Sequence, residues 1–282
     1  MPELPEVETI RRYLATHLVG QTICRALLYT KALRRPIPAL NRILPHLAVS
    51  DVRRLGKYLL ICFDQGTLIM HFGMSGRLYW TPNNVKRSKH DHLDMVLSDN
   101  SRLRYNDPRR FGVLLWHVGA INQHSLFAKL GPEPLSQQLS SCYLYGFASA
   151  KKTAIKPLLL NQDFIAGIGN IYASEILFRA RIHPARLANN IADSEWVLLV
   201  SAIKQVLKTA IQAGGSSIKD FVSVNGQLGA FQSQHAVYAR TSQPCIICGS
   251  PIQALLQRQR ISFYCPGCQI LPSAGCTGQA RH

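Results

Sequence analysis

Residues 152–178 read KTAIKPLLLNQDFIAGIGNIYASEILF, a stretch in which two helical patterns meet at a glycine-rich turn. Apolar residues recur at helical spacing on both sides of the turn GIGN at 167–170, which predicts one helix over 153–160 and a second over 170–179. Glycines let the backbone come close to a ligand, and the N-terminus of the second helix favours an anion such as phosphate. Taken alone, the glycines indicate only a turn.

The patterns on either side of this helix pair differ in kind. Toward the C-terminus, residues 194–213 predict a long helix that ends at two glycines. Toward the N-terminus, the rigid run GPEP at 131–134 predicts a domain boundary, and residues 21–117 contain short β-prone runs separated by turns. Such runs without intervening helices are typical of an antiparallel sandwich or barrel. Residues 3–19 predict an amphipathic helix at the start of the chain.

Four of the eight cysteines form two Cys-x-x-Cys pairs, which are separated by sixteen residues. Each pair can present two thiolates to one ion, and this spacing is typical of tetrahedral structural zinc. Two disulfides are the alternative, which a reducing cytosol disfavours. Because four sulfurs fill the coordination shell, we expect one structural Zn²⁺ without a catalytic role. The expected ligands are Cys245, Cys248, Cys265 and Cys268. The cysteines without such a pattern are Cys24, Cys62, Cys142 and Cys276.

The chain of 282 residues is strongly basic, with 32 Lys and Arg against 15 Asp and Glu and a net charge of +17. Residues 1–120 have a net charge of +9 and residues 121–282 one of +8, so the excess is spread over both halves. This distribution favours nucleic acid as a partner, with a generally basic enzyme as the alternative. No apolar run approaches the ~18 residues of a membrane helix, and the N-terminus lacks an export signal pattern. We therefore expect a soluble cytoplasmic protein with no membrane partner.

The N-terminal residues carry a reactive group if Met1 is removed, since Pro2 would then have a free secondary amine. The pKa of such an amine is roughly 8, so part of it is neutral near pH 7. Its attack on an aldehyde-level carbon gives an iminium ion, which is a strong electron sink. Glu3 beside it is able to move protons. This pair alone is also compatible with an N-terminus that has no function.

The opening MPELPEVET at 1–9 resembles that of the formamidopyrimidine-DNA glycosylases, bacterial enzymes of base-excision repair. The resemblance spans nearly the whole chain in the same order. Besides 152–178 and the cysteine pairs, it includes RLGKYLL at 54–60, HFGMSG at 71–76, DPRRFG at 107–112 and GGSSIKDF at 214–221. It implies a bifunctional DNA glycosylase and AP lyase, which excises 8-oxoguanine and formamidopyrimidines from duplex DNA and cuts the strand by β,δ-elimination. No redox cofactor is expected.

The resemblance also implies a fold class, an α+β protein. An N-terminal helix and an antiparallel β-sandwich would form a catalytic domain over 1–130. A helical domain with a helix–two-turn–helix motif would occupy 131–238, and a β-hairpin zinc finger 239–270. Residues 271–282 are expected to form a disordered tail. We also expect a monomer that works on damaged double-stranded DNA at the nucleoid.

Four residues receive catalytic roles from the resemblance. Pro2 would attack C1′ of the damaged nucleotide, and Glu3 would act as general acid and base. Glu6 would support them, although a surface carboxylate that compensates the helix dipole is an equal alternative. Lys57, in a strand-like run, would bind the phosphate beside the lesion, and a solvated lysine at a strand edge is its alternative.

Further residues would contact the DNA. Met74, Arg109 and Phe111 match the side chains that fill the gap left by an everted base: Met and Phe can wedge between bases, and Arg can donate to the orphaned cytosine. Phosphate contacts are expected from His71, Lys156, Asn170, Tyr238 and Arg260. Structural roles remain open for His71 and Tyr238, and simple solvation for Lys156; Arg258 is interpreted as a surface charge. Ser216 and Ser217 would border the base pocket, beside a loop whose sequence NGQLGAF departs from the family's pattern.

Two other functions compete with this prediction. An endonuclease VIII-like glycosylase would prefer oxidised pyrimidines, but that branch lacks the combination of the N-terminal motif with Met74, Arg109 and Phe111. A non-catalytic zinc-containing DNA-binding protein would explain the charge, the turn and the cysteines. It gives no reason for Pro2 and Glu3 to occur together.

Overall fold

The computed structural model describes residues 2–216 and 229–272. They belong to two compact units: the first comprises the described residues of Met1–Leu130 and Lys208–Ser233, and the second comprises those of Gly131–Leu207 and Gln234–His282. Several sequence predictions fall outside the described residues, namely those for Ser217, Cys276 and positions 273–282 of the expected tail. Among the described residues, no helix has the length and apolar character needed to cross a membrane.

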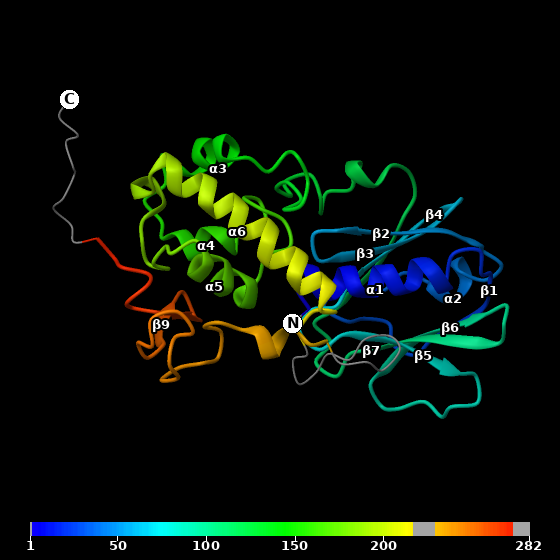
Figure 1. Ribbon diagram of the computed structural model, residues 1–282. Helices are drawn as coiled ribbons and strands as arrows, with labels where there is room; N and C mark the ends of the chain where they lie inside the picture. Colours follow the sequence, from blue (N-terminus) through cyan, green and yellow to red (C-terminus); the bar gives the residue numbers. More distant parts are fainter. Residues whose placement is uncertain (1, 217–228, 273–282) are drawn as a thin grey trace. The chain divides into compact units, whose positions relative to one another are not determined.

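The first unit contains two antiparallel four-stranded sheets, with strand orders β1-β6-β7-β5 and β2-β3-β4-β8. Its elements in chain order are α1 (Leu4–His17), β1 (Ile23–Leu28), α2 (Leu40–Ile43), β2 (Val49–Leu55), β3 (Tyr58–Phe63), β4 (Gly66–His71), β5 (Arg77–Pro82), β6 (Asp91–Leu97), β7 (Ser101–Asn106) and β8 (Val113–His117). A short 3-10 helix follows at Ile121–Gln123. Figure 1 shows α1 in blue beside the strands of this unit.

Both sheets and α1 share one hydrophobic core, which makes this unit a sandwich. The apolar face of α1, with Val7, Ile10 and Leu14, is buried, and the helix packs against β2 and β3. Strands of both sheets turn their apolar side chains toward the same interior. The predicted α+β class with an N-terminal helix and an antiparallel β-sandwich is therefore confirmed, and the barrel alternative is wrong.

The sheet β1-β6-β7-β5 also buries charged groups. Arg104 donates from Nε to Asp94 Oδ1 at 2.6 Å, and Arg102 donates from Nη1 to Asp94 Oδ2 at 2.9 Å. Tyr79 donates its hydroxyl to Asp91 at 2.8 Å, and Asp91 pairs with Arg104 at 3.3 Å. Removing one partner would leave a buried charge uncompensated, which costs about 3–5 kcal/mol. These pairs therefore make the register between β6 and β7 specific.

The second unit is helical and carries a two-stranded hairpin. Its elements are α3 (Ser141–Ala148), α4 (Ile155–Leu159), α5 (Asn170–Arg179), a 3-10 turn (Ala188–Asn190), most of α6 (Asp193–Gln212) and the strands β9 (Gln253–Gln257) and β10 (Arg260–Tyr264). Apolar residues at the base of the hairpin form a small core with Cys245 and Cys265. The expected helices and the expected hairpin between the cysteine pairs are thus present.

Candidate functional site

The N-terminus of α1 holds two buried carboxylates directly after Pro2, which is itself buried. Glu3 is the N-cap residue, and its side chain accepts the backbone N–H of Glu6. In return, the backbone N–H of Glu3 donates to Glu6 Oε2 at 2.8 Å. This capping box places Glu3 and Glu6 together at the chain start because two helix N–H groups need acceptors there. Glu6 is 0% exposed, so the interpretation as a surface carboxylate is wrong.

Glu6 also binds a segment more than two hundred residues away in the chain. The backbone N–H of Ser216 donates to Glu6 Oε1 at 2.8 Å. Gly215 has φ +80°, and a Cβ on it would lie 2.8 Å from the same oxygen. The backbone can therefore approach the carboxylate this closely only at a glycine. Ser216, a predicted pocket residue, is thereby held next to the N-terminal carboxylates.

Lys57 lies in the turn between β2 and β3, and not within a strand as the sequence suggested. Gly56, with φ +57°, makes this turn possible. Lys57 is only 8% exposed, which also overturns the alternative of a solvated lysine. The Lys57 charge lowers the pKa of His71, the last residue of β4. His71 pairs in register with Tyr58, the residue that follows Lys57.

His71 is a neutral hydrogen-bond donor in this structure. Burial, followed by the positive charges of Lys57 and Arg34, lowers its pKa from 6.5 to about 4. Its Nδ1 accepts the backbone N–H of Gly73 at 3.1 Å, so the ring proton resides on Nε2. An uncharged Nε2–H beside the cations of Lys57 and Arg34 is suited to binding an anion. The sequence did not indicate Arg34, because its effect on the pKa of His71 arises only when the fold brings its charge near that ring.

The loops that carry the three predicted gap-filling residues pack against each other. Gly73 has φ +58°, and a Cβ there would lie 2.4 Å from the backbone of Phe111. Met74 is half-buried, whereas Arg109 and Phe111 are exposed. The Arg109 guanidinium lies 5.0 Å from the centre of the Phe111 ring. The structure therefore brings the loop of Met74 together with the loop of Arg109 and Phe111. It leaves the Phe111 ring and the Arg109 guanidinium accessible.

Asp107, which sequence reasoning missed as a functional residue, holds these two loops in place. It is completely buried and accepts the Ser75 hydroxyl at 2.6 Å and the Gly112 N–H at 2.8 Å. Ser75 in turn accepts the backbone N–H of Arg109 at 3.1 Å. Its place in the motif DPRRFG was the only signal available, since nothing local indicates which loop an aspartate will bind.

In the second unit, two residues that were predicted to bind phosphate, Lys156 on α4 and Asn170 at the glycine turn, contact the hairpin. Lys156 Nζ donates to the carbonyl oxygen of Ile261 at 3.0 Å, and Asn170 Nδ2 donates to the same oxygen at 3.2 Å. Lys156 is 1% exposed, so the interpretation as a simply solvated lysine is wrong. The two side chains join α4 and the start of α5 to β10, next to Arg260.

The turn before α5 is stiffened by Gln162. Its Nε2 donates to the carbonyl oxygens of Leu160 and Ile168, and its Oε1 accepts the N–H of Gly167. Gly167 has φ +82°, a conformation that favours glycine. The sequence indicates the glycines of this turn, but it does not indicate which backbone groups the Gln162 amide binds.

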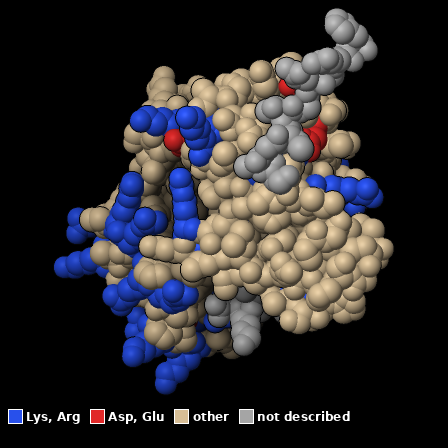
Figure 2. All heavy atoms as spheres, turned by 90° about the vertical axis from the view of Figure 1, so that its left-hand side faces the viewer, with Lys and Arg blue, Asp and Glu red and all other residues tan. Residues whose placement is uncertain are grey.

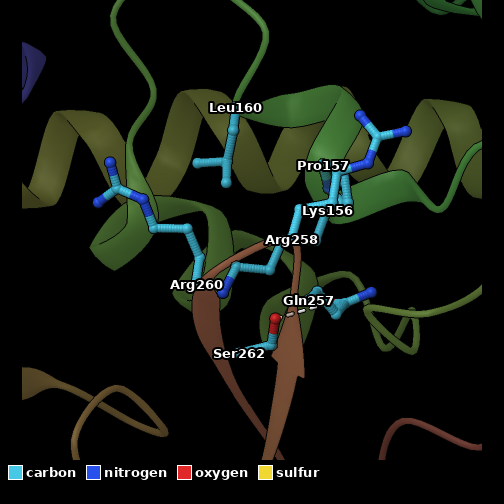
Figure 3. A pocket seen from close by; sticks show the side chains of 7 residues that line it. All are labelled: Lys156, Pro157, Leu160, Gln257, Arg258, Arg260 and Ser262. Atoms are coloured by element: carbon cyan, nitrogen blue, oxygen red, sulfur yellow. Dashed lines mark hydrogen bonds between the residues drawn. The ribbon is translucent and has the colours of Figure 1, made fainter.

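A cavity of about 190 Å³ lies between α4 and the hairpin. Figure 3 shows its lining side chains, which are Lys156, Pro157, Leu160, Gln257, Arg258, Arg260 and Ser262. Arg258 and Arg260 are exposed, and Gln257 accepts the hydroxyl of Ser262. Three basic side chains around one hollow make this part of the unit suited to an anion.

Tyr238 is held through its backbone by Glu175, which sequence reasoning also missed. Glu175 is buried on α5 and accepts the consecutive N–H groups of Ala236, Val237 and Tyr238 at 2.8–3.0 Å. Burial raises the pKa of Glu175, and these three hydrogen bonds oppose the rise. The Tyr238 ring packs edge-on against Phe263, 5.0 Å between centres.

The four predicted ligand cysteines converge. Their Sγ atoms all lie within 4.8 Å of one another, with Cys248 and Cys265 at 3.4 Å and Cys245 and Cys268 at 3.9 Å. A disulfide needs about 2.05 Å, so these sulfurs are unbonded thiols and the disulfide alternative is wrong. Four sulfurs about 2.3 Å from one central ion would be roughly 3.8 Å apart, which the cluster matches. The residues therefore fit a tetrahedral metal ion.

On the face drawn in Figure 2, Lys and Arg gather along one side, and few Asp or Glu are visible. This agrees with the net charge of +17 and with a polyanionic partner.

Comparisons with known proteins agree with the motifs. Family models for the formamidopyrimidine-DNA glycosylase N-terminal domain and H2TH domain match residues 1–114 and 130–222. Formamidopyrimidine-DNA glycosylase from Janthinobacterium sp. (strain Marseille) is 50% identical over 273 residues, which cover 95% of this chain and 100% of that protein. The enzyme of the same name from Methylococcus capsulatus is 46% identical over 270 residues, with the same shares covered.

Solved structures give the same result. The Lactococcus lactis Fpg in complex with DNA containing an abasic site has a TM-score of 0.90 at 35% identity, covering 95% of this chain and 100% of that one. MutM in complex with DNA containing carbocyclic 8-oxo-G has a TM-score of 0.88 at 36% identity, covering 96% and 100%. The capping box after Pro2 and the loops around Asp107 lie within the residues that the N-terminal domain model matches, and the glycine turn lies within those that the H2TH model matches. The chain belongs to the formamidopyrimidine-DNA glycosylase family.

Proposed function

We propose that this chain, a DNA glycosylase for oxidised purines with AP-lyase activity, begins its reaction with the secondary amine of Pro2. The observation that carries the proposal is the buried capping box directly after Pro2. Glu3 and Glu6 are held there by reciprocal backbone hydrogen bonds, and Glu6 also binds Ser216. Catalytic side chains need such fixed positions because small displacements cost large factors in rate.

The proposed chemistry starts on a damaged nucleotide that has been turned out of the duplex. The lone pair of the Pro2 nitrogen, freed by removal of Met1, forms a bond to C1′. The bond between C1′ and the base breaks, and the base leaves with that electron pair and a proton. Opening of the C1′–O4′ bond then gives the iminium ion between Pro2 and C1′. Glu3 moves the protons of these steps.

Strand cleavage follows from the same iminium ion. Loss of a C2′ proton sends an electron pair toward the iminium and expels the 3′ phosphate, which is the β-elimination. A second elimination expels the 5′ phosphate, and water finally releases the sugar fragment from Pro2. Glu6 acts as a positioning residue because its oxygens are occupied by the backbone N–H groups of Glu3 and Ser216.

The remaining predicted residues are assigned to the DNA. Lys57 and the Nε2–H of His71 would bind a phosphate beside the lesion, since a cation and a neutral donor lie together there. Met74, Arg109 and Phe111 would fill the gap left by the flipped base. In the second unit, Asn170, Lys156, Tyr238 and Arg260 would bind phosphates, and Ser216 would border the base pocket. Ser217, also proposed for that pocket, lies outside the described residues.

For the cysteine cluster we propose one structural Zn²⁺, since four thiolates match the preference of that ion. With four protein ligands the ion would have no open position for substrate. It would fix the hairpin that carries Arg260. We further propose that the protein acts as a monomer in the bacterial cytoplasm at the nucleoid, which sedimentation of the protein alone and of its DNA complex tests for the oligomeric state.

Borohydride trapping tests the proposed mechanism. The expected result is a covalent protein–DNA adduct on an 8-oxoguanine:cytosine duplex, with Pro2 as the linked residue in peptide mass spectrometry. Glu3→Gln should greatly reduce base release, whereas Asp99→Asn, a matched change at an exposed carboxylate, should not. Full trapping by protein that retains Met1 would overturn the role of Pro2. Preferred cleavage of a dihydrothymine duplex would favour the endonuclease VIII-like alternative, and binding without cleavage would favour a non-catalytic protein.

A further inference from the structure

Two exposed basic loops of the first unit carry cations that have no role in the proposed reaction, apart from Arg34, whose charge acts on His71. The loop 83–90 joins β5 to β6, as Figure 1 shows, and the loop 29–36 follows β1. Together they carry six exposed cationic side chains, which are Lys31, Arg34, Arg35, Lys86, Arg87 and Lys89. We call this set the basic loop surface. Among the residues that the structure describes, none of these six forms an ion pair with a carboxylate.

Buried arginines hold the loop 83–90 in a defined conformation. Arg104 donates to the carbonyl oxygens of Lys86 and Val85 at 3.2 Å, and Arg102 donates to that of Asn83 at 2.6 Å. Both arginines are themselves fixed by Asp94. An ordered loop loses less entropy when it binds, so its charges are available to a ligand at lower cost.

The two loops are joined to each other and to the gap-filling segment 107–112. The Arg87 guanidinium lies 4.5 Å from the centre of the Tyr29 ring, which links the loop 83–90 to the loop 29–36. The backbone N–H of Arg34 donates to Gly112 at 3.3 Å, and that of Asp107 donates to His90 at 3.0 Å. The basic loop surface is therefore continuous with the loop that presents Arg109 and Phe111.

Within residues 2–216 and 229–272, no exposed carboxylate neutralises this surface. The acidic residues of that part that contact the loops or their supporting arginines are Asp91, Asp94 and Asp107, and all three are buried. Asp91 accepts the N–H of Ser88 at 2.6 Å and pairs with Arg104, and Asp94 pairs with both buried arginines. The six exposed cations thus present a net positive surface to solvent.

We propose that the basic loop surface binds phosphates of the duplex that flanks the lesion, beyond the base pair where Arg109 and Phe111 act. This inference rests on the proposed function, because it takes the position of the DNA from the gap-filling segment. Backbone phosphates are the fitting ligand, since Lys and Arg on ordered loops recognise them without regard to base sequence. The surface would add affinity and register on the DNA and would not choose the lesion.

The test compares two triple variants with the same change in charge. The first is Lys86→Ser, Arg87→Ser and Lys89→Ser. The control is Arg12→Ser, Arg42→Ser and Arg53→Ser, at exposed positions of which two are already paired with acids. Binding of a catalytically inert Glu3→Gln background to a long lesion duplex is measured over a range of salt concentrations. The first variant should lower the slope of log Kd against log salt by up to about 2.7, at about 0.9 per phosphate contact, and the control much less.

Shortening the duplex identifies where the lost contacts lie. When the duplex is truncated on the side of the lesion that the surface contacts, the first variant and its Glu3→Gln parent should bind equally. With Glu3 restored in both proteins, single-turnover cleavage at saturating DNA should be the same with and without the triple change. Slopes equal to those of the control, or the same loss on short and long duplexes, would overturn the inference. Should the triple variant fail to fold, Lys86→Ser with Lys89→Ser keeps the Arg87–Tyr29 contact. Wild type that does not cleave an 8-oxoguanine duplex would instead refute the proposed function.

Discussion

Replacing His71 with asparagine tests whether this histidine is neutral because of its surroundings. Asparagine keeps an acceptor near the Gly73 N–H but cannot gain a proton in the accessible pH range. In the wild type, burial and the charges of Lys57 and Arg34 lower the pKa of His71 to about 4, against 6.5 in the unfolded chain. Between these values the unfolded state binds more protons, so the free energy of unfolding falls as the pH falls.

The size of the effect follows from the two pKa values. The contribution of His71 is fully present above pH 6.5 and is lost as the pH falls toward 4. Between pH 7.5 and pH 5.0 the wild type should lose about 2 kcal/mol through this residue, and the His71→Asn variant should not. Other histidines with lowered pKa values, such as His235 in the second unit, remain in both proteins. The difference between the two pH profiles therefore isolates His71.

The assay is urea unfolding followed by tryptophan fluorescence in a Trp196→Phe background. Trp80 and Trp116 then report on the first unit, since Trp196 belongs to the second. His46→Asn is the matched control, because His46 is exposed. Equal losses of stability in wild type and His71→Asn between pH 7.5 and pH 5.0 would refute the argument that the surroundings keep His71 neutral.

Three further predictions concern Glu6, Asp107 and the cysteines. Gly215→Ala should abolish most borohydride trapping, because its Cβ would meet Glu6 Oε1 at 2.8 Å, whereas Gly20→Ala, with a similar φ of +84° and nothing within 4 Å, should trap normally. Asp107→Asn should lower the free energy of unfolding by about 1–3 kcal/mol, since one buried donor loses its acceptor. The same variant should show a weaker preference for cytosine opposite 8-oxoguanine, whereas Asp99→Asn should leave both properties unchanged. Metal analysis should find one zinc per chain; its removal by a chelator, or Cys265→Ser, should weaken DNA binding, and Cys142→Ser should not.

Local periodicity was sufficient to predict the position of most helices and strands of this chain. The helix expected over 170–179 is α5, and the one expected over 194–213 is α6 within one residue at each end. Where the prediction was too long, a contact from elsewhere is responsible. The helix expected from 153 begins only at Ile155, because Ala154 is extended and forms a β-bridge with Leu187.

The sequence by itself determined most of the secondary structure, the four-cysteine cluster and the family, since each of these depends on residue types at short and regular spacing. Tertiary structure decided that Glu6 is buried against Ser216, that Lys156 and Asn170 meet at Ile261, and that His71 is neutral. Glu6 and Ser216 are 210 residues apart, and Lys156 and Ile261 are 105 apart. Hydrogen bonds and charge effects over such separations arise only when the backbone brings the groups together, and they leave no periodic trace in the sequence.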